Sequence, residues 1–126
     1  LWLAEQLVSE GLIPAPVMVQ LCMGIPWGAP NDLNTFMAMI NNVPSDWVSS
    51  AFSIGRHQMP YVAAAVLAGA NVRVGLEDNL WLGKGHLATN AELVGRAASI
   101  IDAMGVEIMT PDEVRAELNL TKRDLP

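Results

Sequence analysis

Residues 72–79 read Val72-Arg73-Val74-Gly75-Leu76-Glu77-Asp78-Asn79, an apolar alternation that carries three charged side chains. Side chains on a strand point alternately to its two faces, so the apolar residues would pack against covering helices. Arg73 and Glu77 would share the opposite, interior face, while Asp78 would project from the rim. A buried charge without a partner is costly, so this face needs an ion pair, a metal or a substrate. The segment therefore predicts a functional site at the end of a strand.

The rest of the chain repeats the order strand, loop, helix. Strands are predicted at 17–23, 47–52 and 72–77, and helices follow near 32–40, 60–68 and 89–104. Strands that alternate with helices form a parallel sheet with right-handed crossovers. An open doubly wound sheet and part of an eight-stranded barrel both fit, and both bind ligands at the carboxyl ends of their strands.

Helix ends are marked by recognisable signals. Thr89-Asn90-Ala91-Glu92 and Thr110-Pro111-Asp112-Glu113 both have the spacing of a capping box. They predict a helix that stops at Gly105 and a short terminal helix through Leu118. Residues 1–8 resemble the end of a helix closed by Gly11, so the chain is expected to begin inside a longer protein.

The composition restricts the class of protein. The 126 residues suffice for one small domain, and only 16% of them are charged, against about 25% in typical domains. Other protein is therefore expected to cover part of the surface. No apolar run reaches the roughly 18 residues that cross a bilayer, and no signal peptide is recognisable. The net charge is −6 and no basic stripe exists, so a nucleic-acid partner is not expected.

The remaining candidate residues give weaker signals. The single Cys22 excludes an internal disulfide and favours a reducing, cytoplasmic setting. His57 suits a capping or packing role at a helix start, and His86 lies in a glycine-rich loop where it would be solvated. Trp27, near two glycines, could be the wall of a ligand pocket or could pack within its loop. From the pattern alone, a structural Arg73–Glu77 ion pair explains the central segment about as well as a functional site.

The central segment also carries a family resemblance. From Arg73 to Asn79 it resembles the β-keto acid cleavage enzymes, whose first characterised type is the 3-keto-5-aminohexanoate cleavage enzyme of lysine fermentation. The likeness continues through Leu82-Gly83-Lys84-Gly85, residues 89–94 and residues 110–115, and upstream through Ile54-Gly55-Arg56 and residues 19–24. It therefore covers nearly the whole chain.

The resemblance implies a fold and a site. Members are complete (β/α)8 TIM barrels of roughly twice this length. Residues 1–126 would be the carboxyl-terminal part: the end of helix five, units six to eight and a terminal helix. The family holds a divalent metal, usually zinc, with an H-x-H pair from an early strand and a glutamate that Glu77 matches. Arg73 and Asp78 match the arginine and aspartate thought to activate the substrate together.

This chain departs from the family pattern, because no H-x-H occurs in it. The remaining metal ligands are expected from an absent amino-terminal half. The implied reaction is cleavage of a β-keto acid with acetyl-CoA to acetoacetate and a new acyl-CoA, by a homo-oligomer that the family suggests is a tetramer. The isolated chain is expected to be inactive. Two alternatives stay open: a non-catalytic α/β assembly domain, and a metal-dependent aldolase or isomerase on the same barrel.

Overall fold

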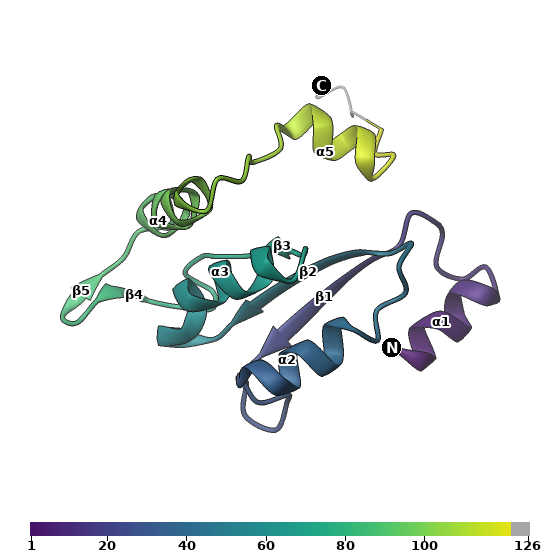
Figure 1. Cartoon of the computed structure of the whole chain (residues 1–126), viewed down its shortest axis with the longest axis horizontal. Helices are drawn as coiled ribbons and strands as arrows, with labels where there is room; N and C mark the ends of the chain where they lie inside the picture. The colour runs from purple at the N-terminus through teal and green to yellow at the C-terminus, as the bar shows by residue number, and fades with distance from the viewer. Residues whose placement is uncertain (122–126) are drawn as a thin grey trace.

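The computed structural model describes residues 1–121 of the chain; the pair Lys122-Arg123 and the end of the predicted 1–126 domain lie outside them. The elements in chain order are α1 (Trp2–Ser9), β1 (Met18–Met23), α2 (Leu33–Ile40), β2 (Val48–Ser53), a 3-10 turn (Gly55–His57), α3 (Gln58–Leu67), β3 (Asn71–Val72), β4 (Trp81–Gly83), β5 (His86–Leu87), α4 (Asn90–Ala103) and α5 (Pro111–Glu117). Figure 1 shows α2 and α3 beside the sheet, with α5 standing away from it.

The first three strands form one parallel sheet in the order β1-β2-β3. Met18 pairs with Val48 and Met23 with Ser53, so β1 and β2 are in register over their whole length. The pairing of β2 with β3 covers only Ser50 and Ala51. The mixed α/β class and the parallel arrangement predicted from the strand–helix alternation are therefore confirmed.

One face of this sheet forms the main core together with α2 and α3. Its buried members are Leu21, Met23, Phe36, Ala51, Tyr61, Ala65 and Ala70. The rings of Phe36 and Tyr61 meet edge to face, with centroids 5.5 Å apart. Burying a side chain such as Phe36 contributes about 1.5–3 kcal/mol to folding. The small side chains of Ala51 and Ala65 let α3 approach β2 closely.

The other face of the sheet mixes polar and apolar side chains. It carries Gln20 on β1, then Ser50 and Phe52 on β2, because side chains alternate along each strand. The apolar run of β1 predicts a strand buried on both faces, but only one face is buried in the described residues. Leu21 and Met23 are buried, whereas Gln20 is exposed.

The third strand is shorter than the sequence predicts. It ends at Val72 rather than continuing through Glu77. Gly75 has a φ of +154°, a conformation that favours glycine, and its carbonyl accepts hydrogen bonds from the N–H groups of Asp78 and Asn79. The chain therefore leaves the sheet after Val72 and closes a turn over residues 75–79.

The loop predicted over residues 78–88 contains a hairpin. Strands β4 and β5 pair antiparallel, with Trp81 opposite Leu87 and Gly83 opposite His86. The tip is Lys84-Gly85, and Gly85 has a φ of +75° as such a tight connection requires. Both predicted capping boxes are present, at Thr89 and at Thr110.

Candidate functional site

Arg73 is the centre of the site, immediately after β3. Its Nε lies 2.9 Å from Oδ2 of Asp78, and its Nη2 lies 3.3 Å from Oδ1 of the same carboxylate. Nη2 also lies 2.6 Å from Oε2 of Glu77, and Nη1 donates to Oε1 of Gln20 at 2.9 Å. Bidentate pairing fixes both the position and the plane of a carboxylate. The site thus consists of one guanidinium that holds two acids and an amide.

The face of the sheet that carries Gln20, Ser50 and Phe52 supports this guanidinium. The guanidinium carbon of Arg73 lies 4.5 Å from the ring centroid of Phe52, a cation–π distance. Gln20, which accepts from Arg73, in turn donates to Oγ of Ser50 at 3.1 Å. All three supports come from β1 and β2, so the sheet fixes where Arg73 lies.

Asp78 is buried and Glu77 is exposed, the reverse of the arrangement predicted from strand alternation. The side chain of Asp78 is 5% exposed and that of Glu77 is 83% exposed. The prediction is wrong because residues 75–79 form a turn, in which consecutive side chains do not alternate between two faces. The predicted grouping is nevertheless present, since Arg73 contacts both acids.

Two amides that the sequence patterns did not single out hold this turn. Gln58, at the start of α3, is fully buried and donates from Nε2 to the carbonyl of Gly75 at 3.0 Å. Asn90, in the first turn of α4, accepts from the N–H of Leu76 at 2.9 Å. The sequence signal for Gln58 is a polar amide at the start of an otherwise apolar helix, a position that the helix pattern predicts to be partly buried.

The backbone of Asp78 is fixed from a third direction. Its carbonyl accepts from the N–H of Gly55 at 2.7 Å, which joins the turn to the residues that follow β2. Gly55 has a φ of +64°, so its backbone adopts a conformation that other residues rarely take. Asp78 is therefore held through both its carboxylate and its main chain.

Cys22 lies close enough to Asp78 and Arg73 for their charges to shift the pKa of its thiol. Burial raises the pKa of the Cys22 thiol, the negative charge of Asp78 raises it further, and Arg73 lowers it in opposition. The net direction keeps the thiol neutral. Cys22 therefore does not have the lowered pKa of a nucleophilic cysteine.

The other candidates do not join this site. His57 accepts from Nε of Arg56 at 3.2 Å, and His86 lies 3.5 Å from Glu92 with 60% of its side chain exposed. The solvated position predicted for His86 is confirmed. The side chain of Trp27 is fully exposed, so the described residues provide no pocket that it could line.

The residues present do not form a metal centre by themselves. Within residues 1–121, no group of three or more His, Cys, Asp or Glu side chains is placed to hold a metal ion. Catalytic zinc takes three protein ligands. Glu77 can supply one exposed carboxylate at the carboxyl end of the sheet, but that carboxylate is bonded to Arg73.

The paired charges of Arg73, Glu77 and Asp78 follow the carboxyl end of a parallel sheet, the edge at which α/β proteins generally bind ligands. The family model described as beta-keto acid cleavage enzyme matches residues 1–120. The chain belongs to the beta-keto acid cleavage enzyme family, as the resemblance predicts.

Several curated proteins are similar to this chain. A 3-dehydrocarnitine:acetyl-CoA trimethylamine transferase of Rhizobium meliloti is 70% identical over 123 residues, which are 98% of this chain and 41% of that protein. A 3-keto-5-aminohexanoate cleavage enzyme of Fusobacterium nucleatum is 37% identical, over 90% of this chain and 42% of that protein. A 3,5-dioxohexanoate:acetyl-CoA acetone transferase of Paraburkholderia graminis is 36% identical, over 90% and 38%. The chain spans about two fifths of the length of these relatives.

No helix within residues 1–121 has both the length and the apolar character that crossing a membrane requires.

Proposed function

We propose that the complete gene product containing this chain is an acyltransferase that cleaves a β-keto acid with acetyl-CoA. The reaction is R–CO–CH₂–COO⁻ plus acetyl-CoA giving acetoacetate plus R–CO–CoA, so one carbon–carbon and one thioester bond break and one of each forms. The observation that carries the proposal is the bidentate Arg73–Asp78 pair in a chain that belongs to this family.

The fold proposed for the complete protein is a (β/α)8 barrel, of which this chain supplies units six to eight. The sheet face that carries Gln20, Ser50 and Phe52 would line the barrel interior. Strands β1 and β3 are the edges of the sheet and would pair with further strands of the barrel. The apolar helix core would lie between the barrel and its outer ring, as in other barrels.

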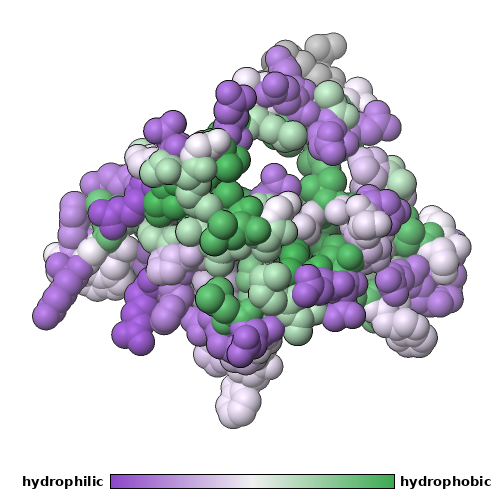
Figure 2. Space-filling model, viewed as in Figure 1, coloured by the Kyte–Doolittle hydropathy of each residue, from purple (hydrophilic) through white to green (hydrophobic). Residues whose placement is uncertain are grey.

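Exposed apolar surface agrees with a chain that is covered by more protein. Trp2 is 78% exposed, Leu67 81% and Val94 54%. Figure 2 shows apolar side chains across the middle of one face and a hollow below α5. Cavities of about 300 and 250 Å³ lie there, and both are lined by Met109 and Val114. We propose that the rest of the barrel and a second subunit cover these surfaces.

In the proposed chemistry Asp78 accepts a proton from the β-keto acid. Arg73 holds the Asp78 carboxylate in one orientation, and a positioned base of this kind contributes about 10²–10⁴-fold to a rate. The supports on Gln20 and Phe52 keep the guanidinium from turning away when substrate enters. Glu77 is proposed as one ligand of a divalent metal, with zinc as the first candidate. Its other ligands would come from residues outside this chain. Such a metal polarises a keto oxygen when it is bound.

The β-keto acid to try first is 3-dehydrocarnitine, because it appears in the name of the 70% identical relative. The test mixes the complete gene product with acetyl-CoA and 3-dehydrocarnitine and follows acetoacetate by mass spectrometry. Acetoacetate that appears only when both substrates are present supports the proposal. Acetyl-CoA that stays unconsumed with every β-keto acid tried would refute it and would leave an aldolase or isomerase on the same barrel.

One observation favours a second function for part of the site. The 2.6 Å contact between Arg73 and Glu77 is the ion pair expected if the segment only stabilises an α/β assembly domain. Metal analysis of the complete gene product separates the two roles, because a structural pair needs no metal.

A further inference from the structure

A cavity near the site lies between the β4–β5 hairpin, the start of α3 and the middle of α4. Its volume is about 560 Å³, within the range of small-molecule sites. It is lined by Arg56, Met59, Asn79, Trp81, Leu82, Gly83, Lys84, Gly85 and Arg96. Asn79 directly follows Asp78, so the cavity and the Arg73–Asp78 pair share one turn of the chain.

The charge of this cavity is unusual for the chain that forms it. Arg73 and Arg115 form ion pairs with carboxylates. The other lysine and arginine side chains of residues 1–121 are Arg56, Lys84 and Arg96, and all three line this cavity. No aspartate or glutamate does. In a chain with a net charge of −6, the cations that lack a carboxylate partner within the described residues thus gather in one place.

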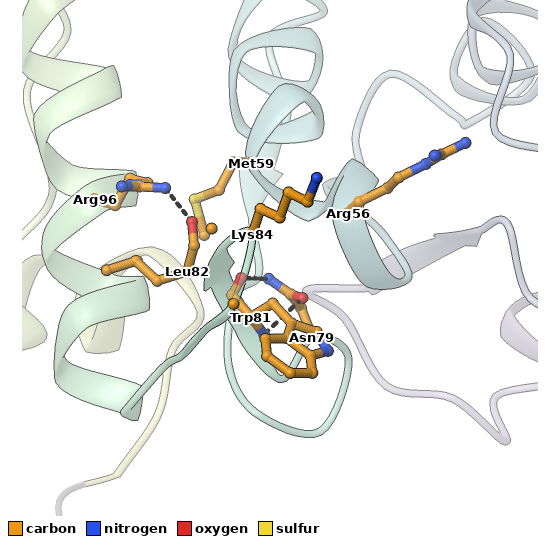
Figure 3. A pocket seen from close by; sticks show the side chains of 9 residues that line it. Arg56, Met59, Asn79, Trp81, Leu82, Lys84 and Arg96 are labelled. Carbon is orange, nitrogen blue, oxygen red and sulfur yellow. Dashed lines mark hydrogen bonds between the residues drawn. The ribbon is translucent and has the colours of Figure 1, made fainter.

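The cations come from separate elements, so the fold brings them together. Figure 3 shows Lys84 extending from the hairpin toward the side on which Arg56 lies, while Arg56 reaches outward at the edge. Arg96 of α4 donates to the carbonyl of Leu82, which ties the hairpin to the helix. Asn79 bonds both the N–H and the carbonyl of Trp81, at 3.1 and 2.7 Å, and so fixes where the hairpin begins.

The cavity also has apolar walls beside its charges. Trp81 is 51% exposed, and Met59 and Leu82 also line the cavity. A half-exposed indole is a stacking surface for a flat heteroaromatic ring. Arginine and lysine side chains without carboxylate partners bind phosphate oxygens. Together these features fit a ligand that has phosphate groups and a flat base.

The place of the cavity agrees with this ligand. It lies between the residues that follow β2 and those that follow β3. In the proposed barrel these are the loops after strands seven and eight, where TIM barrels frequently bind phosphate. We propose that the cavity binds the nucleotide phosphates of acetyl-CoA and leaves its thioester end toward Asp78. This inference rests on the proposed function.

The test measures nucleotide binding and turnover separately. 3′-Phosphoadenosine 5′-phosphate is titrated calorimetrically into the complete gene product, and turnover is measured with acetyl-CoA and with acetyl-pantetheine, a thioester without phosphates. In the Lys84→Gln and Arg96→Gln variants we expect binding of the nucleotide to weaken about tenfold each, since one charged hydrogen bond is lost. KM for acetyl-CoA should rise similarly while KM for acetyl-pantetheine stays unchanged. Arg115→Gln, which removes an ion-paired cation on α5, should alter neither.

Each result has a separate meaning. If Arg96→Gln unfolds the hairpin, Lys84→Gln at the exposed tip decides alone. Nucleotide binding that is equal in wild type and Lys84→Gln would overturn the inference even if acetoacetate forms. If the variants lose nucleotide binding but the wild-type protein shows no acyl transfer, the nucleotide site stands and the proposed function is overturned. Binding of inorganic phosphate as tight as that of the nucleotide would also overturn it.

Discussion

Arg73 and Asp78 are joined by two hydrogen bonds, of 2.9 and 3.3 Å, and the Asp78 side chain is 5% exposed. The neighbouring Glu77 makes a 2.6 Å contact with the same guanidinium but is 83% exposed. A charge that is desolvated depends on its partner far more than a charge in water does. The two acids should therefore differ in what they contribute to stability.

A pair of double-mutant cycles measures this difference. In the complete gene product, the Arg73→Met and Asp78→Asn cycle should give a coupling of roughly 1–3 kcal/mol in unfolding free energy. The matched cycle of Arg73→Met with Glu77→Gln should give less than about 1 kcal/mol, because exposed pairs contribute little. Chemical denaturation provides both values. Equal coupling in the two cycles would contradict the burial described for Asp78.

Gln58→Met tests whether the turn that carries Asp78 is held from α3. The substitution keeps the side-chain volume but removes the side-chain hydrogen bond to the Gly75 carbonyl, at a cost of about 1 kcal/mol. Because the turn positions Asp78, kcat should fall while KM for acetyl-CoA changes little. Gln6→Met is the control, since the Gln6 amide bonds only to the exposed Glu10. A wild-type kcat for Gln58→Met would show that Gln58 does not position the site.

How much of this site the sequence predicts depends on the backbone at each residue. Strand alternation and helix signals correctly predict the parallel pairing of β1 with β2 and the contact of Arg73 with Glu77, whereas only the family resemblance associates Arg73 with Asp78. They fail after Val72, because alternation assumes an extended backbone and Gly75 starts a turn. The bonds that close this turn, from Gln58 and Asn90, join residues distant in sequence. No local pattern contains such contacts.

The sequence does not predict the β4–β5 hairpin, for a related reason. Strands of two or three residues give too short an alternation to recognise, and the glycines on both sides of Lys84 suggest a loop. The hairpin is held by tertiary bonds, from Asn79 to Trp81 and from Arg96 to Leu82. Capping boxes, in contrast, are local signals, and both were correctly predicted.

The capping box at the start of α4 predicts a pH dependence. A hydrogen bond from the backbone N–H of Thr89, then one from its hydroxyl, lower the pKa of Glu92 below its ordinary 4.5. A lowered pKa in the folded state stabilises the fold above the ordinary value, and that stabilisation is lost as pH falls through the lowered pKa. In the Glu92→Gln variant, the unfolding free energy should therefore fall less as the pH is lowered.

Denaturation at about pH 6 and about pH 3 checks this expectation. The difference in stability between the two conditions should be smaller for Glu92→Gln than for wild type. Glu107→Gln, in the loop between α4 and α5, is the matched control and should keep the wild-type difference. If the unfolding free energies of both variants fall by the same amount between the two pH values, Glu92 does not have the proposed capping role.

The proposed metal role of Glu77 has its own test. If Glu77 is a ligand, Glu77→Gln should lower the zinc content of the complete gene product several-fold, because one charged ligand is lost. Asp112→Gln removes an exposed acid that pairs with Arg115 on α5, and it should leave the metal content unchanged. Zinc is measured by atomic emission after dialysis. Full zinc occupancy in Glu77→Gln would assign this carboxylate to the ion pair with Arg73 alone.

The central claim is that Asp78, held by Arg73, activates a β-keto acid for acyl exchange with acetyl-CoA. The most direct measurement is the initial rate of acetoacetate formation from acetyl-CoA and 3-dehydrocarnitine by the wild-type complete gene product and by Asp78→Asn, which conserves shape. The account predicts a rate about 10²–10⁴-fold lower for the variant, with its fold intact by circular dichroism. A folded Asp78→Asn protein that works at the wild-type rate would contradict it.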